Sequence, residues 1–211
     1  MKTNMVKGLP EKTIERLSQY RRVLLGCLQQ RKFNIYSHEL GQLLHLNPVQ
    51  VRRDIMLIGH TGTLRKGYDV KQLSDLIGEI IDSKKSQKVA VVGVGNLGRA
   101  IMSYFQGKRT KLVIAAAFDN DPSKVDRVIA GIRCYHIDDL EEVVKQEQIT
   151  ISIITVPPEH AVETAERLVM AGIKGILNYT PVALNVEPHA YLEEYDMITS
   201  IEKVAFYAKN R

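Results

Sequence analysis

A glycine-rich hexapeptide that follows a short apolar run constrains the fold of this chain more than any other feature. The run Lys88–Val92 is rich in β-branched residues, which is typical of a strand buried on both faces of a parallel sheet. Gly93-Val94-Gly95-Asn96-Leu97-Gly98 follows at once, and the pattern from Arg99 to Gln106 predicts a helix. Glycines in such a strand–turn–helix unit provide a tight turn, close backbone approach to a pyrophosphate and close helix packing. The hexapeptide therefore predicts a dinucleotide-binding unit.

A carboxylate at the end of the next predicted strand supports this reading. The apolar run Leu112–Phe118 ends at Asp119, which lies 21 residues after Gly98. A carboxylate at this spacing can accept hydrogen bonds from ribose hydroxyls. It would also repel a 2′-phosphate, and the following residues 120–123 contain no arginine to offset that repulsion. The sequence therefore favours NAD(H) over NADP(H) as the cofactor.

Strand and helix patterns alternate through the rest of this region. Strands are predicted at 132–135, 151–156 and 175–179, and helices at 138–148 and 159–171. This alternation predicts a doubly wound parallel sheet, in which ligands bind outside the carboxyl ends of the strands. The segments 155–158 and 178–181 are therefore expected at the nicotinamide end, although both could serve simply as turns. The predicted cofactor-binding residues are Gly93, Gly95, Asn96, Leu97, Gly98, Asp119, Lys124, Thr155, Val156, Pro157, Asn178 and Tyr179.

The charge of the chain is unevenly distributed. Residues up to Ser86 include 15 Lys and Arg against 8 Asp and Glu, whereas the residues from Gln87 onward include 14 against 16. Like charges concentrated on one small unit are tolerated when the partner is a polyanion whose counterions are released on binding. The first 86 residues are therefore expected to bind nucleic acid, although a solvated basic surface without a partner is an alternative.

Three helices and a hairpin are predicted in this basic region. The first helix spans 10–30, the second begins with Ser37 as its N-cap, and the third runs from the N-cap Asn47 through Pro48 to Gly59. The glycine-punctuated segment 59–70 predicts a hairpin wing with basic residues at its tip. A helix–turn–helix with a wing docks its third helix in the DNA major groove.

The exposed residues of the third helix and of the wing are the predicted DNA contacts. A buried stripe of Val51, Ile55 and Ile58 would turn Arg53 outward. Gln50, Arg52 and Arg53 are the candidates for base edges, and the alternative is that they are ordinary solvated residues. The full predicted set is Asn47, Gln50, Arg52, Arg53, Arg65, Lys66 and Tyr68.

The predicted organisation has three parts: a winged helix-turn-helix domain at 1–86, a doubly wound Rossmann domain at 87–199 and a C-terminal dimerisation helix at 200–211. The last helix has apolar residues on one face and is too short to be stable alone, so we expect it to dock on a partner protomer. No run of about 18 apolar residues occurs, and no signal peptide is evident, so a cytoplasmic location is expected. Cys27 and Cys134 are expected in the core, with no metal site.

Several longer motifs occur along nearly the whole chain: Val51-Arg52-Arg53-Asp54, Gly67-Tyr68, Gly93 to Ala100, Phe118 to Pro122, Thr155-Val156-Pro157 and Ala171 to Asn178. Together they resemble the Rex family of redox-sensing transcriptional repressors. The resemblance implies a homodimer that binds palindromic operator DNA when NAD⁺ prevails, leaves it when NADH binds, and exchanges a C-terminal helix between protomers. It also implies a ligand-sensitive switch formed by Arg22, Tyr104 and Asp196, and a regulator that is not an enzyme.

Two other functions are compatible with parts of the pattern. A small NAD-dependent oxidoreductase could use His160, His189 or Lys174 for proton transfer, but too little chain remains to build a substrate domain. A coenzyme A-binding module shares the glycine loop and the doubly wound sheet. Asp119 argues against that alternative.

Overall fold

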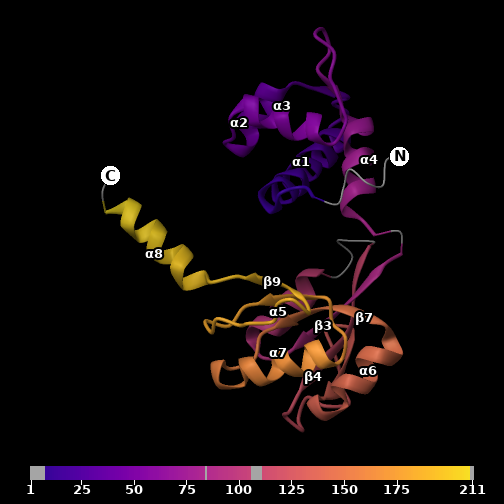
Figure 1. The fold of residues 1–211 in the computed structure, drawn as a ribbon, viewed down its shortest axis with the longest axis vertical. Coiled ribbons are helices and arrows are strands. Elements are labelled where there is room, and N and C mark those ends of the chain that lie inside the picture. The colour runs from indigo at the N-terminus through magenta and orange to yellow at the C-terminus, as the bar shows by residue number, and fades with distance from the viewer. Residues whose placement is uncertain (1–7, 84, 106–110, 210–211) are drawn as a thin grey trace. The chain divides into compact units, whose positions relative to one another are not determined.

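A computed structural model of the chain describes residues 8–83, 85–105 and 111–209, which form two units, Met1–Lys84 and Lys85–Arg211 (Figure 1). The predicted fold class is confirmed: a helical N-terminal unit precedes a parallel sheet with helices and a C-terminal helix. Among the described residues, no helix is long and apolar enough to cross a membrane.

The first unit is built from four helices and two very short strands. In chain order these are α1 (Glu11–Gln29), β1 (Asn34–Ile35), α2 (Ser37–Leu44), α3 (Pro48–Leu57), β2 (Tyr68–Asp69) and α4 (Val70–Ile81). Leu17, Leu24 and Ile55 are among the fully buried side chains around which these helices pack. Strands β1 and β2 pair antiparallel, a contact that the sequence did not predict.

The helix starts show which local signals were correct. The Asn47 side chain accepts a hydrogen bond from the Val49 N–H at 2.8 Å, which confirms it as the N-cap of α3. Ser37 as an N-cap was wrong, because it is the first helical residue of α2 and Tyr36 precedes it as the cap. There the Glu39 carboxylate accepts from the Tyr36 N–H at 2.8 Å, so the third residue of the helix supplies the capping oxygen.

The second unit is a seven-stranded sheet in the order β5-β6-β4-β3-β7-β8-β9. Its strands are β3 (Gln87–Val92), β4 (Leu112–Asp119), β5 (Val128–Ile129), β6 (Ile132–His136), β7 (Ile149–Ile154), β8 (Gly175–Asn178) and β9 (Tyr191–Glu194). All pairings are parallel except that of β5 with β6. Strands β5 and β9 were not predicted.

Helices cover both faces of this sheet (Figure 1). They are α5 (Asn96–Phe105), α6 (Leu140–Glu147) and α7 (Ala161–Met170), and α8 (Met197–Ala208) ends the described chain. Met102 of α5 packs in one core with Val91, whereas Leu140 and Leu168 pack in the other with Phe118. This placement of helices is the doubly wound arrangement.

Both cysteines are buried and free, as expected. Burial raises the pKa of the Cys134 thiol to about 11, and the neighbouring Asp119 carboxylate adds to that shift. A buried thiol with a raised pKa is an unreactive core residue.

Candidate nucleotide-binding and DNA-binding sites

The glycine loop between β3 and α5 is packed so tightly that two of its positions exclude a side chain. A Cβ on Gly98 would lie 2.1 Å from the Gly93 carbonyl oxygen, and one on Gly93 would lie 2.6 Å from the Thr155 carbonyl oxygen. Gly93 also has a φ of +93°, which favours glycine. By contrast, a Cβ on Gly95 would have no atom within 4 Å, so the backbone there is open to a ligand. These are the three roles expected of a dinucleotide-binding glycine loop.

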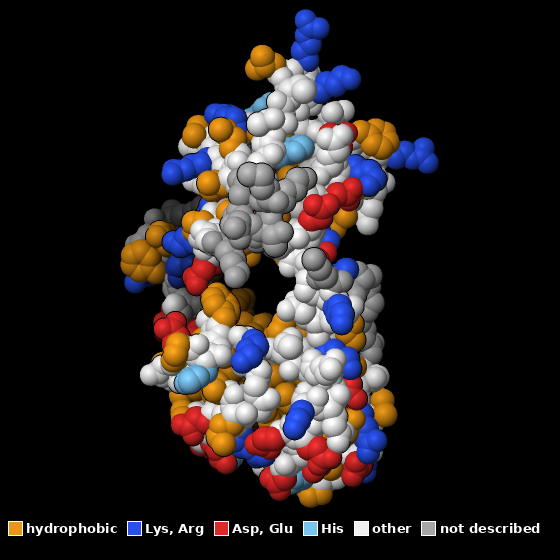
Figure 2. Space-filling view, turned by 45° about the vertical axis from the view of Figure 1, so that its right-hand side comes forward, with side chains coloured by type: hydrophobic (Ala, Val, Ile, Leu, Met, Phe, Trp, Pro, Cys, Tyr) orange, Lys and Arg blue, Asp and Glu red, His pale blue; other side chains and the backbone are white. Residues whose placement is uncertain are grey.

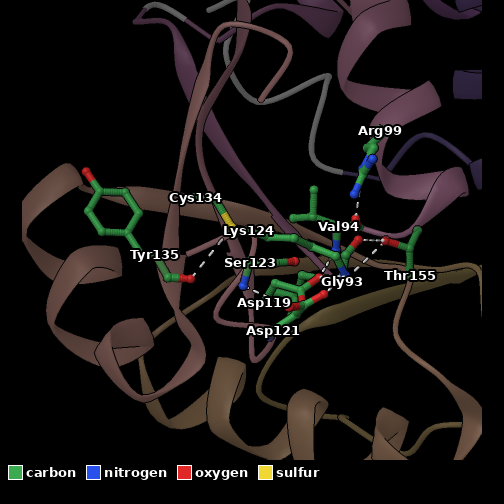
Figure 3. A network of polar contacts seen from close by, with 11 residues as sticks. Gly93, Val94, Arg99, Asp119, Asp121, Ser123, Lys124, Cys134, Tyr135 and Thr155 are labelled. Carbon is green, nitrogen blue, oxygen red and sulfur yellow. Dashed lines mark hydrogen bonds and ion pairs between the residues drawn. The ribbon is translucent and has the colours of Figure 1, made fainter. Parts of the chain in front are cut away.

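Asp119 at the end of β4 is tied directly to this loop (Figure 3). Its Oδ2 accepts from the Val94 N–H at 2.7 Å and from the Lys124 ammonium at 3.1 Å, and its Oδ1 accepts from the Asp121 N–H at 2.9 Å. The Asp119 residue is only 8% exposed. The carboxylate is therefore held in place by protein donors beside the glycine turn.

Lys124 brings a cation to this carboxylate. Burial alone would lower the pKa of Lys124, but its hydrogen bonds and charge interactions with Asp119 and Asp121 outweigh burial and raise it. Lys124 is therefore a charged partner of Asp119. Lys124 directly follows the segment 120–123, which contains no arginine, so a cation does lie next to the Asp119 carboxylate.

A cavity of about 600 Å³ opens beside the loop and the carboxylate. This volume is in the usual range for small-molecule and cofactor sites. Nine of the predicted cofactor-binding residues line it: Gly93, Gly95, Asn96, Leu97, Asp119, Lys124, Thr155, Val156 and Pro157. The structure thus brings together segments that follow β3, β4 and β7.

Three predicted residues do not line this cavity. Gly98 acts from behind, by allowing α5 to approach the Gly93 carbonyl. Asn178 is buried, its amide donates to the Val182 carbonyl, and its oxygen accepts from the Thr180 N–H and hydroxyl. Tyr179 packs against Tyr195, with ring centroids 5.1 Å apart. Asn178 therefore shapes the turn after β8, which is the alternative considered for that segment.

Helix α7 and the segment after β6 supply a wall that sequence reasoning missed. The residues of this wall are Ile137, Asp138, His160, Glu163, Thr164 and Arg167, and the ends of β3 and β4 add Val92, Phe118 and Asn120 to the lining. The Arg167 guanidinium donates to both Glu141 carboxylate oxygens, at 2.8 and 2.9 Å, and to the Ile137 carbonyl at 2.9 Å. These bonds tie α7 to the start of α6. No motif marks the positions on α7, although Glu163 and Arg167 are four residues apart and so share one helix face.

The α3 helix of the first unit is held by a buried polar network. Asp54, which is fully buried, accepts from Arg16 Nε and Nη2 at 2.6 and 2.8 Å and from the Tyr20 hydroxyl at 2.8 Å. Gln50 Nε2 donates to the same carboxylate at 2.8 Å. Burial alone would raise the pKa of Asp54, but the hydrogen bonds from Arg16, Tyr20 and Gln50 outweigh it and lower the pKa. The network fixes α3 against α1.

The outward side of α3 carries the predicted arginines. Arg52 and Arg53 are exposed, and Arg52 Nη1 donates to the Ser37 hydroxyl at 3.1 Å. Gln50 is different, because its amide is engaged with Asp54 inside the unit. The structure therefore presents the two arginines outward, whereas Gln50 is half-buried and tied to Asp54.

The predicted hairpin is shorter than expected. It consists of one antiparallel bridge between Thr63 and Gly67, with reciprocal hydrogen bonds of 2.8 Å. The Tyr36 hydroxyl donates to the Arg65 carbonyl at 2.7 Å and so braces the tip. Arg65 and Lys66 are exposed there, whereas Tyr68 is only 7% exposed and belongs to the core. Figure 2 shows basic side chains projecting from the end of this unit.

Known proteins resemble the chain in both units. One family model, described as a CoA binding domain, matches residues 84–182, and another, described as a putative DNA-binding protein N-terminus, matches residues 8–55. The redox-sensing transcriptional repressor Rex of Desulfitobacterium hafniense is 37% identical over 203 residues, which cover 96% of this chain and 97% of that relative. This chain belongs to the Rex family of redox-sensing transcriptional repressors.

Solved structures of a Rex-family repressor, RSP, have the same fold. RSP in complex with β-NAD⁺ and operator DNA matches with a TM-score of 0.88 and 28% identity, over 96% of this chain and 94% of that chain. RSP in complex with β-NADH matches with a TM-score of 0.85, over 96% and 95% of the two chains. As a Rex-family repressor, the chain is not an enzyme, which confirms the prediction over the dehydrogenase alternative.

The switch residues suggested by the resemblance to Rex lie on separate elements. Arg22 is exposed on α1, and Tyr104 is 65% exposed on α5. Asp196 is the N-cap of α8, where its carboxylate accepts from the Ile198 N–H at 2.8 Å and the Thr199 N–H at 3.2 Å. The pKa of Asp196 is lowered by its bonds to Thr199 and Ile198. Their joint action as a switch stays a prediction.

Proposed function

We propose that this chain is a cytoplasmic, homodimeric repressor that binds palindromic operator DNA and is released when NADH fills the cavity of its second unit. One observation carries the proposal: the same chain has a basic recognition helix with a wing and a cavity whose glycine loop and carboxylate suit NAD(H). The relative RSP has been crystallised with NAD⁺ and operator DNA, and with NADH.

The cavity residues supply the binding chemistry that a dinucleotide needs. The open backbone at Gly95, at the start of α5, can approach the pyrophosphate, which the helix N-terminus favours. Asp119 can accept from ribose hydroxyls, and Lys124 beside it is a donor for ribose or phosphate oxygens. The Asp119 carboxylate disfavours the 2′-phosphate of NADP(H), although the Lys124 ammonium paired with it offsets part of this repulsion. Coenzyme A, which the matched domain model names, is the competing ligand.

Helix α8 supports the dimer. None of its described residues is buried, although Ile198, Ile201 and Val204 are apolar. A twelve-residue helix with an uncovered apolar face is marginal in water. A second copy of the chain could cover this face by exchanging helices, and a two-fold symmetric dimer matches a palindromic site.

Selection of duplexes from a randomised pool tests the proposal. We expect the purified chain to recover an inverted repeat without NADH and to lose it when NADH is present. Calorimetry with NADH, NAD⁺, NADPH and coenzyme A should show that NADH and NAD⁺ bind more tightly than the other two ligands. Recovery of no duplex at low salt would overturn the proposal, and tight binding of coenzyme A alone would favour the alternative ligand.

A further inference from the structure

The outward face of α3 carries apolar side chains that the core does not use. Val49 is 59% exposed and Met56 is 64% exposed, and Leu57 is also exposed. Together with Arg52 and Arg53 they line a hollow of about 480 Å³ on the surface of the unit. Val49 and Met56 are seven residues apart, so they lie on one helix face with the arginines beside them. Apolar side chains gathered on an exposed face usually mark an interaction surface.

The polar side chains of α3 are not all equally available to contact the edges of bases. The Gln50 amide donates one hydrogen to the buried Asp54 carboxylate at 2.8 Å, so its orientation is fixed by the interior of the unit. Gln50 is therefore a positioning residue for α3. What α3 offers outward is two guanidinium groups and a patch of aliphatic carbon and sulfur.

Only one base presents an apolar group in the major groove, and that group is the 5-methyl of thymine. On the basis of the proposed function, we infer that Val49 and Met56 read thymine in the operator by contact with its 5-methyl group. Arg52 and Arg53 complement the charge of the DNA and hold the face against it, which removes water from the aliphatic patch. The patch thus specifies sequence, whereas cations alone would bind any duplex.

Deoxyuridine substitution tests this contact, because it removes the methyl group and changes nothing else. The probe is the duplex that the full chain recovers from a randomised pool, with each thymine replaced in turn. We expect about a fourfold loss of affinity for each contacted thymine, which corresponds to the burial of one methyl group. V49A and M56A should each bind the thymine duplex more weakly and should lose the difference between thymine and deoxyuridine at the position that each contacts.

Matched controls distinguish the loss of a contact with the thymine methyl group from a general loss of DNA affinity or of stability. M170A removes a methionine that is 83% exposed on α7 of the other unit, and it should leave the thymine preference intact. Because Val49 and Met56 are uncharged, their variants should keep the salt dependence of binding, whereas R53A should reduce it, because Arg53 complements the charge of the DNA. V49A and M56A should also unfold at the wild-type temperature, since both side chains are mostly exposed.

Two results would overturn the inference. One is an affinity that deoxyuridine leaves unchanged at every position, and the other is a full preference for thymine over deoxyuridine in both V49A and M56A. Either result would leave the proposed repressor function standing, because the duplex would still be recovered. Failure to recover any duplex would overturn both.

Discussion

Asp54 is a single carboxylate on which the geometry of the recognition helix depends. It is fully buried and accepts hydrogen bonds from Arg16, Tyr20 and Gln50. Removal of one member of a buried hydrogen-bonded ion pair leaves an uncompensated charge, which costs about 3–5 kcal/mol. We expect D54N to lower the free energy of unfolding of the first unit by about that amount. Urea denaturation of the wild type and D54N at neutral pH measures the difference in the free energy of unfolding.

The pH dependence of this loss follows from the lowered pKa of Asp54. A carboxylate with a lowered pKa in the folded state contributes its stability above the ordinary value of 3.8, and this contribution disappears as the pH falls toward the folded value. The difference between wild type and D54N should therefore shrink below about pH 4. D75N, which alters an exposed carboxylate on α4, is the control and should have nearly the free energy of unfolding of the wild type. If D54N remained less stable than the wild type by the same amount down to about pH 2, the role given to the ionised Asp54 carboxylate would be contradicted.

Asp119 is the residue at which we expect the choice between NADH and NADPH to be made. D119N removes the charge but keeps a hydrogen-bonding side chain, so we expect NADH affinity to fall about 10- to 100-fold, in line with the loss of one or two charge-assisted hydrogen bonds. NADPH should gain relative to NADH, because the repulsion of its 2′-phosphate is removed while Lys124 remains. Fluorescence titration with both nucleotides measures the ratio. An unchanged ratio would show that Asp119 does not face the 2′ position.

At the scale of elements, the glycine loop makes a prediction that separates folding from binding. G98A would place a Cβ 2.1 Å from the Gly93 carbonyl, so the loop and α5 must shift, at a cost of about 1–3 kcal/mol. G95A has open space around the new Cβ and should fold normally. We expect both variants to bind NADH more weakly, but only G98A to unfold at a lower temperature. Normal NADH binding by G95A would contradict close approach of the ligand at that position.

The elements that the sequence predicted well are those whose cause is local. The Asn47 cap with Pro48 after it marks the start of α3, and the alternation of apolar runs marks the main strands. Strand β9 was missed because its sequence, Tyr-Leu-Glu-Glu, has half-polar composition, and only pairing with β8 makes it a strand. Helix α4 begins at Val70, because the Asp69 side chain caps it by accepting from the Gln72 N–H.

The candidate site could be predicted from the sequence only where its residues lie in motifs at the ends of predicted strands. The glycine loop, Asp119 and the Thr155 segment follow from strand ends that a parallel sheet brings to one edge. The α7 wall with Arg167 depends on a helix packing across that edge, and Gln50 is turned inward by a carboxylate four residues away. Neither fact could be read from residue type, because Gln50 and Arg167 are equally suited to a solvated surface.

At the scale of the whole molecule, helix α8 should decide the oligomeric state. Aspartate at Ile201 and Val204 would place charge on the face proposed to be covered by the second copy. We expect I201D/V204D to be monomeric in sedimentation experiments and to bind the palindromic duplex more weakly, since one half-site is lost. K203D, an equally exposed change of charge on the same helix, is the control and should remain dimeric. A dimer that survives I201D/V204D would place the interface elsewhere.

At the same scale, we expect nucleotide binding in the cavity and DNA binding by the first unit to be coupled, so that each changes the free energy of the other. A ligand can release DNA only if its affinity differs between the free and DNA-bound states, and DNA must then weaken that ligand by the same factor. The most direct test is fluorescence anisotropy of a labelled operator duplex, titrated with NADH and, separately, with NAD⁺. We predict that NADH releases the duplex and NAD⁺ does not, and that the duplex weakens NADH binding by the same factor. Equal effects of the two nucleotides, or none from either, would contradict the account.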